Sequence, residues 1–196
     1  MKRAVPIFIL LLVTSLSLTA QSTWKLDPGH AKMTFTVTHL TISEIDGVFR
    51  DFEASITTSK EDFSDAVFEL SAELNTLTTN NERRDAHLQR EDMFHVEKYP
   101  KLTFKSTSIT KTSDKKFELK GDLSIKGVSK SVILELTLLG AIEHPRSKKK
   151  MAGFKGTGTI NRTDFGVGNL PAMVASEEIE LRASGEFVLQ EADEKK

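Results

Sequence analysis

Apolar and polar residues alternate along most of this chain, and this pattern restricts it, more than any other feature, to an all-β fold. Within residues 30–39, for example, Met33, Phe35 and Val37 fall on one face, and threonines and a lysine fall on the other. A period of two is typical of a strand with one buried face, and threonine suits the exposed face. Eight such segments are predicted, at about residues 30–39, 47–57, 66–74, 102–106, 117–125, 132–138, 152–162 and 179–189.

Short turns join most of these segments. A chain of this kind closes as an up-and-down antiparallel barrel or stacks as a sandwich. The barrel is favoured, because a sandwich of this size would be expected to need long crossing connections, and only two long connections occur. Phe49 is out of step with the apolar residues that follow it, which predicts a bulge near Arg50 and Asp51.

One segment, residues 74–104, interrupts the alternation between the third and fourth predicted strands. Asn80 or Asn81 would cap a short helix there. The charges of this helix form either a solvated face or, through Arg83 and Asp85, an ion pair that anchors it. The segment is either part of the functional site or a lid over one barrel end. We interpret it as a lid, with Met93 and Phe94 turned inward.

The two ends of the chain are expected to lie outside the folded domain. Residues 1–20 carry Lys2 and Arg3, then an apolar run and small residues, which is the order of a secretory signal peptide cut after Ala20. A retained anchor is the alternative, but the run is shorter than the ~20 residues that span a bilayer. Residues 21–190 would form one barrel domain and residues 191–196 a charged, disordered tail.

Composition excludes several classes of function. Removal of Lys2 and Arg3 leaves 25 basic against 28 acidic side chains, so nothing favours nucleic acid as a partner. The basic cluster at residues 146–150 is interpreted as a hairpin tip. The chain has no cysteine, which excludes thiolate metal sites, cysteine nucleophiles and disulfides.

The predicted interior is rich in phenylalanine, and there are 12 Phe against one Trp and one Tyr. An eight-stranded barrel can be filled by side chains or can hold one small ligand. Several inward positions carry small residues, which either mark bends of the barrel or leave room for an elongated apolar ligand. These positions are Ala72, Gly121, Ala152, Gly156, Gly158, Ala183 and Gly185.

Few residues suggest chemistry. His39 is the one histidine on a predicted inner face. It would contact a ligand head group, act as a general base, or only form structural hydrogen bonds at the end of its strand. His87 and His95 would share a helix face only if the helix continued past Met93, and no further ligands lie at a recognised metal-binding spacing. No Gly-x-Ser-x-Gly nucleophile motif occurs. No catalytic residue and no metal site is therefore predicted.

An ordered series of short motifs covers nearly all of the chain that follows residue 20. The motifs are Trp24-x-x-Asp27-x-x-His30, Phe35-x-Val37-x-His39, Gly47-x-Phe49, Thr79-x-x-x-Arg83-x-Asp85-x-His87-Leu88, Phe94, Tyr99-Pro100, Phe104, Gly121-Asp122-Leu123, Gly127-Val128 and Arg162-x-Asp164-Phe165-Gly166. This series resembles the YceI-like family. Two departures are Ala31, where the family usually has Ser, and Ser176-Glu177, where Gly-Asp is more typical.

The resemblance implies an exported, lipocalin-like antiparallel barrel that holds a polyisoprenoid chain or an isoprenoid quinone in a long tunnel. It implies no cofactor and no catalytic residue, a periplasmic or secreted location, and a homodimer as one assembly. On the inner faces and in the lid we expect the tunnel to be lined by Phe35, Val37, His39, Phe52, Leu70, Met93, Phe94, Phe104, Leu119, Leu123, Leu134, Phe154, Ile160, Leu181 and Phe187.

The sequence predicts the first of three functions and leaves the other two as alternatives. The first is binding of an isoprenoid-type lipid for transport, storage or sequestration in the cell envelope. The second is an enzyme that acts on a lipid or quinone in the same cavity, with His39 as base. The third is a filled barrel that serves only as an interaction module.

Overall fold

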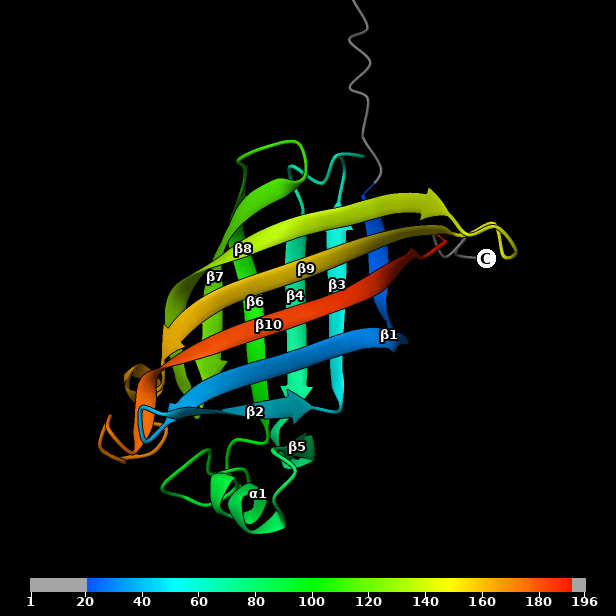
Figure 1. Cartoon of the computed structure of the whole chain (residues 1–196). Coiled ribbons are helices and arrows are strands. Elements are labelled where there is room, and N and C mark those ends of the chain that lie inside the picture. The colour runs from blue at the N-terminus through cyan, green and yellow to red at the C-terminus, as the bar shows by residue number, and fades with distance from the viewer. Residues whose placement is uncertain (1–20, 192–196) are drawn as a thin grey trace, which may run out of the picture.

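The computed structural model describes residues 21–191, which form a closed antiparallel barrel with one short α-helix at one end (Figure 1). The predicted signal peptide (residues 1–20) and most of the predicted tail (residues 192–196) lie outside the described residues. The elements are β1 (Ser22–His39), β2 (Ser43–Phe49), β3 (Phe52–Thr58), β4 (Val67–Glu73), η1 (Leu74–Thr76), β5 (Leu77–Thr78), α1 (Glu82–Leu88), β6 (Lys101–Lys111), β7 (Lys116–Ile125), β8 (Val128–Glu143), β9 (Lys150–Asn161), η2 (Arg162–Phe165) and β10 (Ala175–Leu189).

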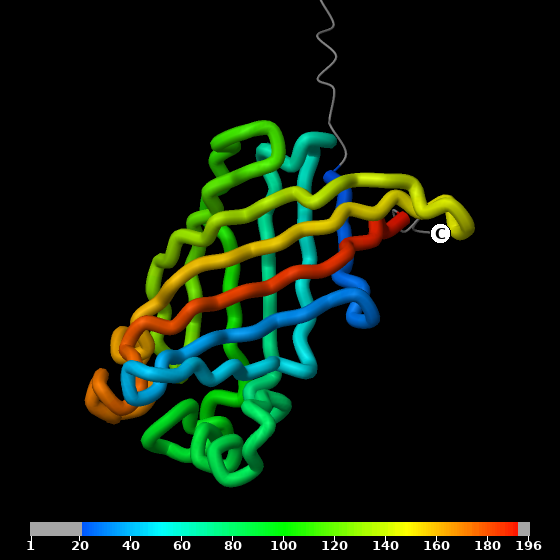
Figure 2. Tube along the Cα trace, in the orientation of Figure 1, coloured from blue at the N-terminus to red at the C-terminus, as the bar shows by residue number. Residues whose placement is uncertain are grey.

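The barrel closes because β1 pairs with β10 along most of its length. On its other side, β1 pairs first with β3 and then, after a bend, with β2. The bend is visible in the tube, where β1 turns between its two halves (Figure 2). β2 and β3 thus share one position, and β5 adds only a two-residue pairing beside β2, so ten labelled strands make an eight-stranded barrel.

The predicted fold class is confirmed, and the boundaries differ in several places. The predicted second strand is split into β2 and β3 at Arg50 and Asp51, where a bulge was expected. The helix does not follow the third predicted strand directly, because η1 and the two-residue strand β5 come between them. β1 also begins eight residues earlier than expected, since the Asp27-Pro28-Gly29 segment forms a bulge inside the strand rather than a turn before it.

The alternation of the sequence becomes the inner and outer faces of the barrel. In β7, Phe117, Leu119, Leu123 and Ile125 are buried and the residues between them are mostly exposed. Within residues 21–191, no helix is long and apolar enough to cross a membrane.

Phe63 closes the barrel end opposite α1. It lies in the β3–β4 connection, is 2% exposed, and packs between Trp24 (ring centroids 5.3 Å apart) and Phe154 (5.1 Å). The same connection is held by Asp65, whose carboxylate accepts hydrogen bonds from the Thr58 hydroxyl and from two backbone N–H groups. Burial alone would raise the pKa of Asp65, but these hydrogen bonds outweigh it and lower the pKa.

α1 and its flanking segments close the other end. Asn81 caps the helix, as the sequence predicted for one of two asparagines, by accepting a hydrogen bond from the Arg84 N–H. Asp85 accepts from Thr78 Oγ1 (2.7 Å) and from the Thr79 N–H (2.8 Å) and hydroxyl. Among the described residues, the anchoring ion pair that the sequence allowed between Arg83 and Asp85 does not form, and these threonines anchor the carboxylate instead.

Asp85 therefore ties the helix to β5 and to the residue that follows it. Burial alone would raise its pKa, yet the bonds from Thr79 and Thr78, with the charge of Arg84, outweigh burial and lower the pKa. Both barrel ends thus depend on an aspartate that must be ionised to hold its hydrogen-bond donors.

Phe63→Ala is expected to lower the free energy of unfolding by about 3–5 kcal/mol, because a buried phenyl ring leaves a cavity that rigid strands cannot collapse. Urea denaturation followed by tryptophan fluorescence measures this change. The control is Leu139→Ala on β8, a 56% exposed side chain, which should change the unfolding free energy by no more than about 0.5 kcal/mol. Equal effects of the two variants would show that Phe63 does not close the barrel.

Acid should weaken both barrel ends. The pKa values of Asp65 and Asp85 are lower in the folded state than their ordinary value of 3.8. Their contribution to stability is therefore complete above pH 3.8 and is lost as the pH falls through the folded pKa values. Asp65→Asn and Asp85→Asn should each cost about 1.5–3 kcal/mol at pH 7.

The measurement is denaturation by urea at several pH values. The difference in unfolding free energy between the protein and each variant should shrink below pH 3.8. A difference that stays constant down to acid pH would contradict the assigned role of the carboxylates.

Candidate functional site

Three apolar cavities follow one another through the barrel interior. A cavity of about 90 Å³ lies toward the end that Phe63 closes. A second, of about 70 Å³, lies in the middle, and the largest, of about 250 Å³, lies beneath α1 and η2. Together they reach the lower part of the range of about 300–1,000 Å³ that is typical of ligand pockets.

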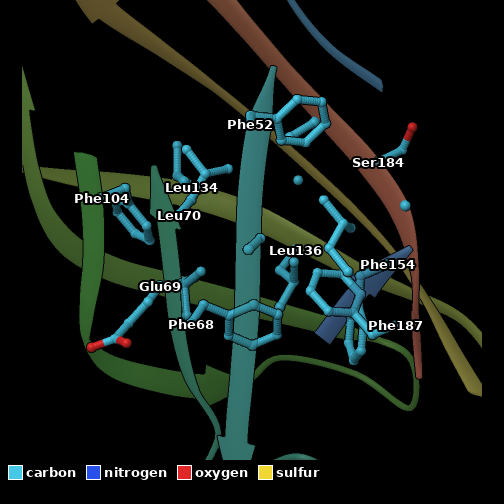
Figure 3. A pocket seen from close by; sticks show the side chains of 16 residues that line it. Phe52, Phe68, Glu69, Leu70, Phe104, Leu134, Leu136, Phe154, Ser184 and Phe187 are labelled. Atoms are coloured by element: carbon cyan, nitrogen blue, oxygen red, sulfur yellow. The ribbon is translucent and has the colours of Figure 1, made fainter. Parts of the chain in front are cut away.

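The walls of the first cavity are almost entirely hydrocarbon. Figure 3 shows Phe68, Leu136 and Phe154 converging from different strands, while the carboxylate of Glu69 and the hydroxyl of Ser184 point away from them. Glu69 instead pairs with Lys105 on the outside of the barrel at 2.7 Å. Among the described residues that line this cavity, no side chain therefore offers a polar group to a ligand.

Only side chains separate the three cavities. The first and second share Leu70, Phe104 and Leu134 among their lining residues. The second and third share Leu102 and Leu181. Rotation of these side chains, without movement of the strands, would join the cavities into one elongated space.

The structure places each sequence-predicted tunnel residue in the wall of at least one cavity, and ligand binding by these residues remains a prediction. The residues divide along the barrel as follows: Phe52, Leu119, Phe154 and Phe187 line the first cavity, Leu70, Phe104 and Leu134 the first and second, Leu123 the second, Leu181 the second and third, and Phe35, Val37, His39, Met93, Phe94 and Ile160 the third.

The space beside each small inward residue shows where the barrel interior is filled and where it is open. A Cβ added at Gly158 would lie 2.4 Å from Leu134 Cδ2, and one at Gly185 would lie 2.5 Å from Leu26 Cδ1. These glycines admit neighbouring side chains and leave no room. A Cβ added at Gly156 would meet no atom closer than 3.9 Å, and this glycine lines both smaller cavities.

The third cavity has a polar end that the other two lack. His39, Thr79, Arg84, His87 and Arg162 line it, and within the described part of the chain no acidic side chain does. The nearby carboxylates are engaged elsewhere, since Asp85 binds the threonines and Asp92 pairs with His87 Nε2 at 3.0 Å. The interior is therefore apolar along its length and cationic at the helical end.

Arg84 and Arg162 are held there by backbone carbonyls and a threonine. Arg84 Nε donates to Thr79 Oγ1 at 2.7 Å, and Nη2 donates to Thr79 O at 2.9 Å. Arg162, which is 7% exposed, makes five bonds from its side chain to the carbonyls of Val167, Gly168, Leu170, Ala175 and Ser176.

The sequence placed Arg162 on an inner face but did not predict its role. The available signal was an arginine in phase with the apolar residues of a strand, directly before a loop with no regular pattern. Such an arginine is unfavourable in an apolar interior unless every donor finds an acceptor, and carbonyl groups of an irregular loop are free to supply them.

His87 and His95 do not form a shared site. α1 ends at Leu88, as expected for a helix that breaks before Met93, and His95 stacks edge-on against Tyr99 with ring centroids 5.8 Å apart. His87 is bound to Asp92. Neither arrangement leaves the two imidazoles facing each other.

A group that the sequence analysis missed lies on the barrel exterior, where Asp27, His30 and Glu186 place one ligand atom each within 4.8 Å of one another. Pairing of β1 with β10 brings Glu186 to the bulge. The hydrogen bond from His30 lowers the pKa of Asp27, and the same bond, with the charge of Glu186, raises the pKa of His30. Such a group could ligate a metal, but the bond of 2.8 Å between Asp27 and His30 already accounts for its geometry.

Comparison with known proteins gives a consistent result. Protein YceI of Salmonella newport (strain SL254) is 34% identical over 181 residues, which are 92% of this chain and 93% of that protein. The crystal structure of Campylobacter jejuni YCEI protein superposes with a TM-score of 0.71 at 30% identity, over 79% of this chain and 90% of that one.

A second solved structure extends the likeness of the fold alone. A polyisoprenoid binding domain from Saccharophagus degradans superposes with a TM-score of 0.64 at 12% identity, over 85% of this chain and 98% of that one. Residues 24–187 match the YceI-like domain. With this match and the identity to the Salmonella protein, the chain belongs to the YceI-like family.

Proposed function

We propose that this protein binds a long, apolar lipid of the isoprenoid type inside the barrel, with the hydrocarbon chain along the three cavities. The observation that carries the proposal is the series of apolar cavities, which only side chains separate and which ends at one cationic group of residues. The description of the Saccharophagus domain as polyisoprenoid binding is consistent with it.

The polarity of the interior sets the orientation of the ligand. Its hydrocarbon end would lie near Phe154, where the walls are aromatic and aliphatic. Its head group would lie beside His39, Arg84 and His87, whose side chains line the third cavity. An oxygen-rich or anionic head group fits this end, because it would accept hydrogen bonds and face no carboxylate.

Hydrophobic transfer can supply the affinity. Each buried methylene contributes about 0.8 kcal/mol, so several isoprene units would offset the cost of ordering the chain and the separating side chains. Isoprenoid branches also suit an interior in which flexible leucines and rigid phenyl rings alternate.

The proposed role is binding without chemical conversion, for transport, storage or sequestration in the cell envelope. The five donor contacts of Arg162 are directed at backbone carbonyls, and the carboxylates nearest the cavity hold the helical end in place. A signal peptide at residues 1–20 is part of this proposal and would place the protein in the periplasm or outside the cell.

Gly156→Leu tests the proposal. The added side chain would occupy the junction of the two smaller cavities, where the glycine leaves room. Purified protein should carry an isoprenoid lipid that native mass spectrometry and organic extraction detect, and the variant should carry about tenfold less, because a blocked tunnel cannot accept the whole chain.

The matched control is Gly140→Leu. A Cβ at Gly140 would meet nothing within 4 Å, and this glycine lines none of the three interior cavities. This variant should keep the lipid. Protein that carries no lipid after expression in its own envelope and binds none when isoprenoids are added, or equal loss in both variants, would refute binding inside the barrel.

A further inference from the structure

Two neighbouring loops at the α1 end of the barrel expose large apolar side chains. These are the β1–β2 turn (residues 40–42) and the loop of residues 166–174, here called together the apolar rim. Ile42 is 84% exposed, Met173 70%, Leu40 48% and Leu170 38%. The loops lie side by side (Figures 1 and 2), and the Leu40 N–H donates to Val174 O at 3.1 Å.

The apolar rim is free of charge over a long stretch of sequence. Residues 38–43 and 165–176 contain no Asp, Glu, Lys or Arg, in a chain of which 28% is charged. The absence of charged side chains does not stabilise a surface that is exposed only to water. The absence of charge is favourable where the loops enter a medium in which an ion would be costly.

The backbone of the turn gives an independent indication. Leu40 and Thr41 both have positive φ, at 50° and 60°, a conformation for which hairpin turns normally use Asn or Gly. A β-branched residue there is a genuine outlier. Such strain is typical of functional segments, and here its effect is to hold two apolar side chains, Leu40 and Ile42, out in solvent.

The second of these loops forms part of the wall of the third cavity. Its residues Val167, Leu170 and Val174 line that cavity, while Met173 faces solvent. Two cations support the loop, since Arg162 binds its carbonyls from within and Lys126 Nζ donates to Gly166 O at 2.8 Å from its edge. One short segment therefore separates the interior from the exposed apolar side chains.

We infer that the apolar rim docks the protein on a lipid bilayer, with Ile42 and Met173 inserted among the acyl chains. The exposed apolar tips carry no charge themselves, and the exposed acidic residues that flank them in sequence, Glu44, Asp164 and Glu177, would remain at the level of the polar head groups. A protein partner would be expected to offer a polar rim that pairs with charges, and these loops carry none. Docking on a bilayer does not require that the barrel hold a lipid. Only the use of docking for lipid exchange with the cavity rests on the proposed function.

The test is flotation with vesicles of phosphatidylethanolamine and phosphatidylglycerol. The purified protein should float with the vesicles, and the double variant Ile42→Asp, Met173→Asp should show a partition coefficient about tenfold lower, because each aspartate would have to be buried in the acyl region. The matched control is Ile142→Asp, a 63% exposed isoleucine at the far end of β8, which should float like the unaltered protein. Circular dichroism establishes that all three proteins are folded.

Three results would overturn the inference. The protein does not float, or the double variant floats as well as the control, or light scattering shows a dimer that the double variant dissociates while no form binds vesicles. The last outcome would assign the apolar rim to a second copy of the chain. Extraction of co-purifying lipid from the same samples keeps the two proposals separate, because vesicle binding by a lipid-free protein would uphold docking and refute the proposed cargo.

Discussion

The pairing of β1 with β10 is the interaction on which the rest of the structure depends. It joins the two ends of the described chain in one antiparallel ladder that runs, with two register shifts, from Trp24↔Leu189 to His39↔Ala175. Without it, the sheet would be open and its apolar face would have no opposite wall. The bulge within β1 lets a single strand pair with β3 in its first half and with β2 in its second, so that the interior becomes long and narrow.

A closed barrel with both ends covered creates an interior that differs from end to end. Phe63 covers one end with an aromatic ring, and the other end is covered by α1 and its flanking segments, which bring arginine and histidine side chains to the largest cavity. The carboxylates of that segment, Asp85 and Asp92, bind threonines and His87 and do not themselves line the cavity. Charge is thus separated, with cations facing the interior and anions anchoring the cover.

Much of this architecture could be predicted from the sequence, because a period of two fixes which side chains face inward whatever the exact strand ends. That is why Phe35, Phe104 and Phe154 lie on the interior as expected. The predicted lid also has Met93 and Phe94 in the cavity wall. The local sequence pattern could not predict the full length of β1. Pro28 and Gly29 are residues typical of a turn, and only the pairing with β10 shows that they form a bulge.

Features that depend on contacts distant in sequence were beyond such reasoning. The sequence offered Arg83 as one possible partner of Asp85, with a solvated face as the alternative, but the donors come from Thr78 and Thr79 on the chain before the helix. The proximity of Glu186 to His30 follows from register alone. Whether a glycine admits a neighbour or leaves space also depends on the facing strand, which is why Gly156 and Gly158 differ although they are two residues apart.

Arg162 links the interior of this protein to its surface. A buried guanidinium without a carboxylate partner is tolerated only because five carbonyl groups, three in the loop of residues 166–174 and two at the start of β10, replace its hydration. The three loop carbonyls in turn would lack partners if the arginine were absent, since they belong to no helix or strand. The shape of the cavity wall and the display of Met173 therefore follow from the same set of hydrogen bonds. A ligand that enters beneath this loop would contact one side of it, and a bilayer outside the barrel would contact the other side. The polar end of the tunnel and the apolar rim therefore depend on the same hydrogen-bonded loop.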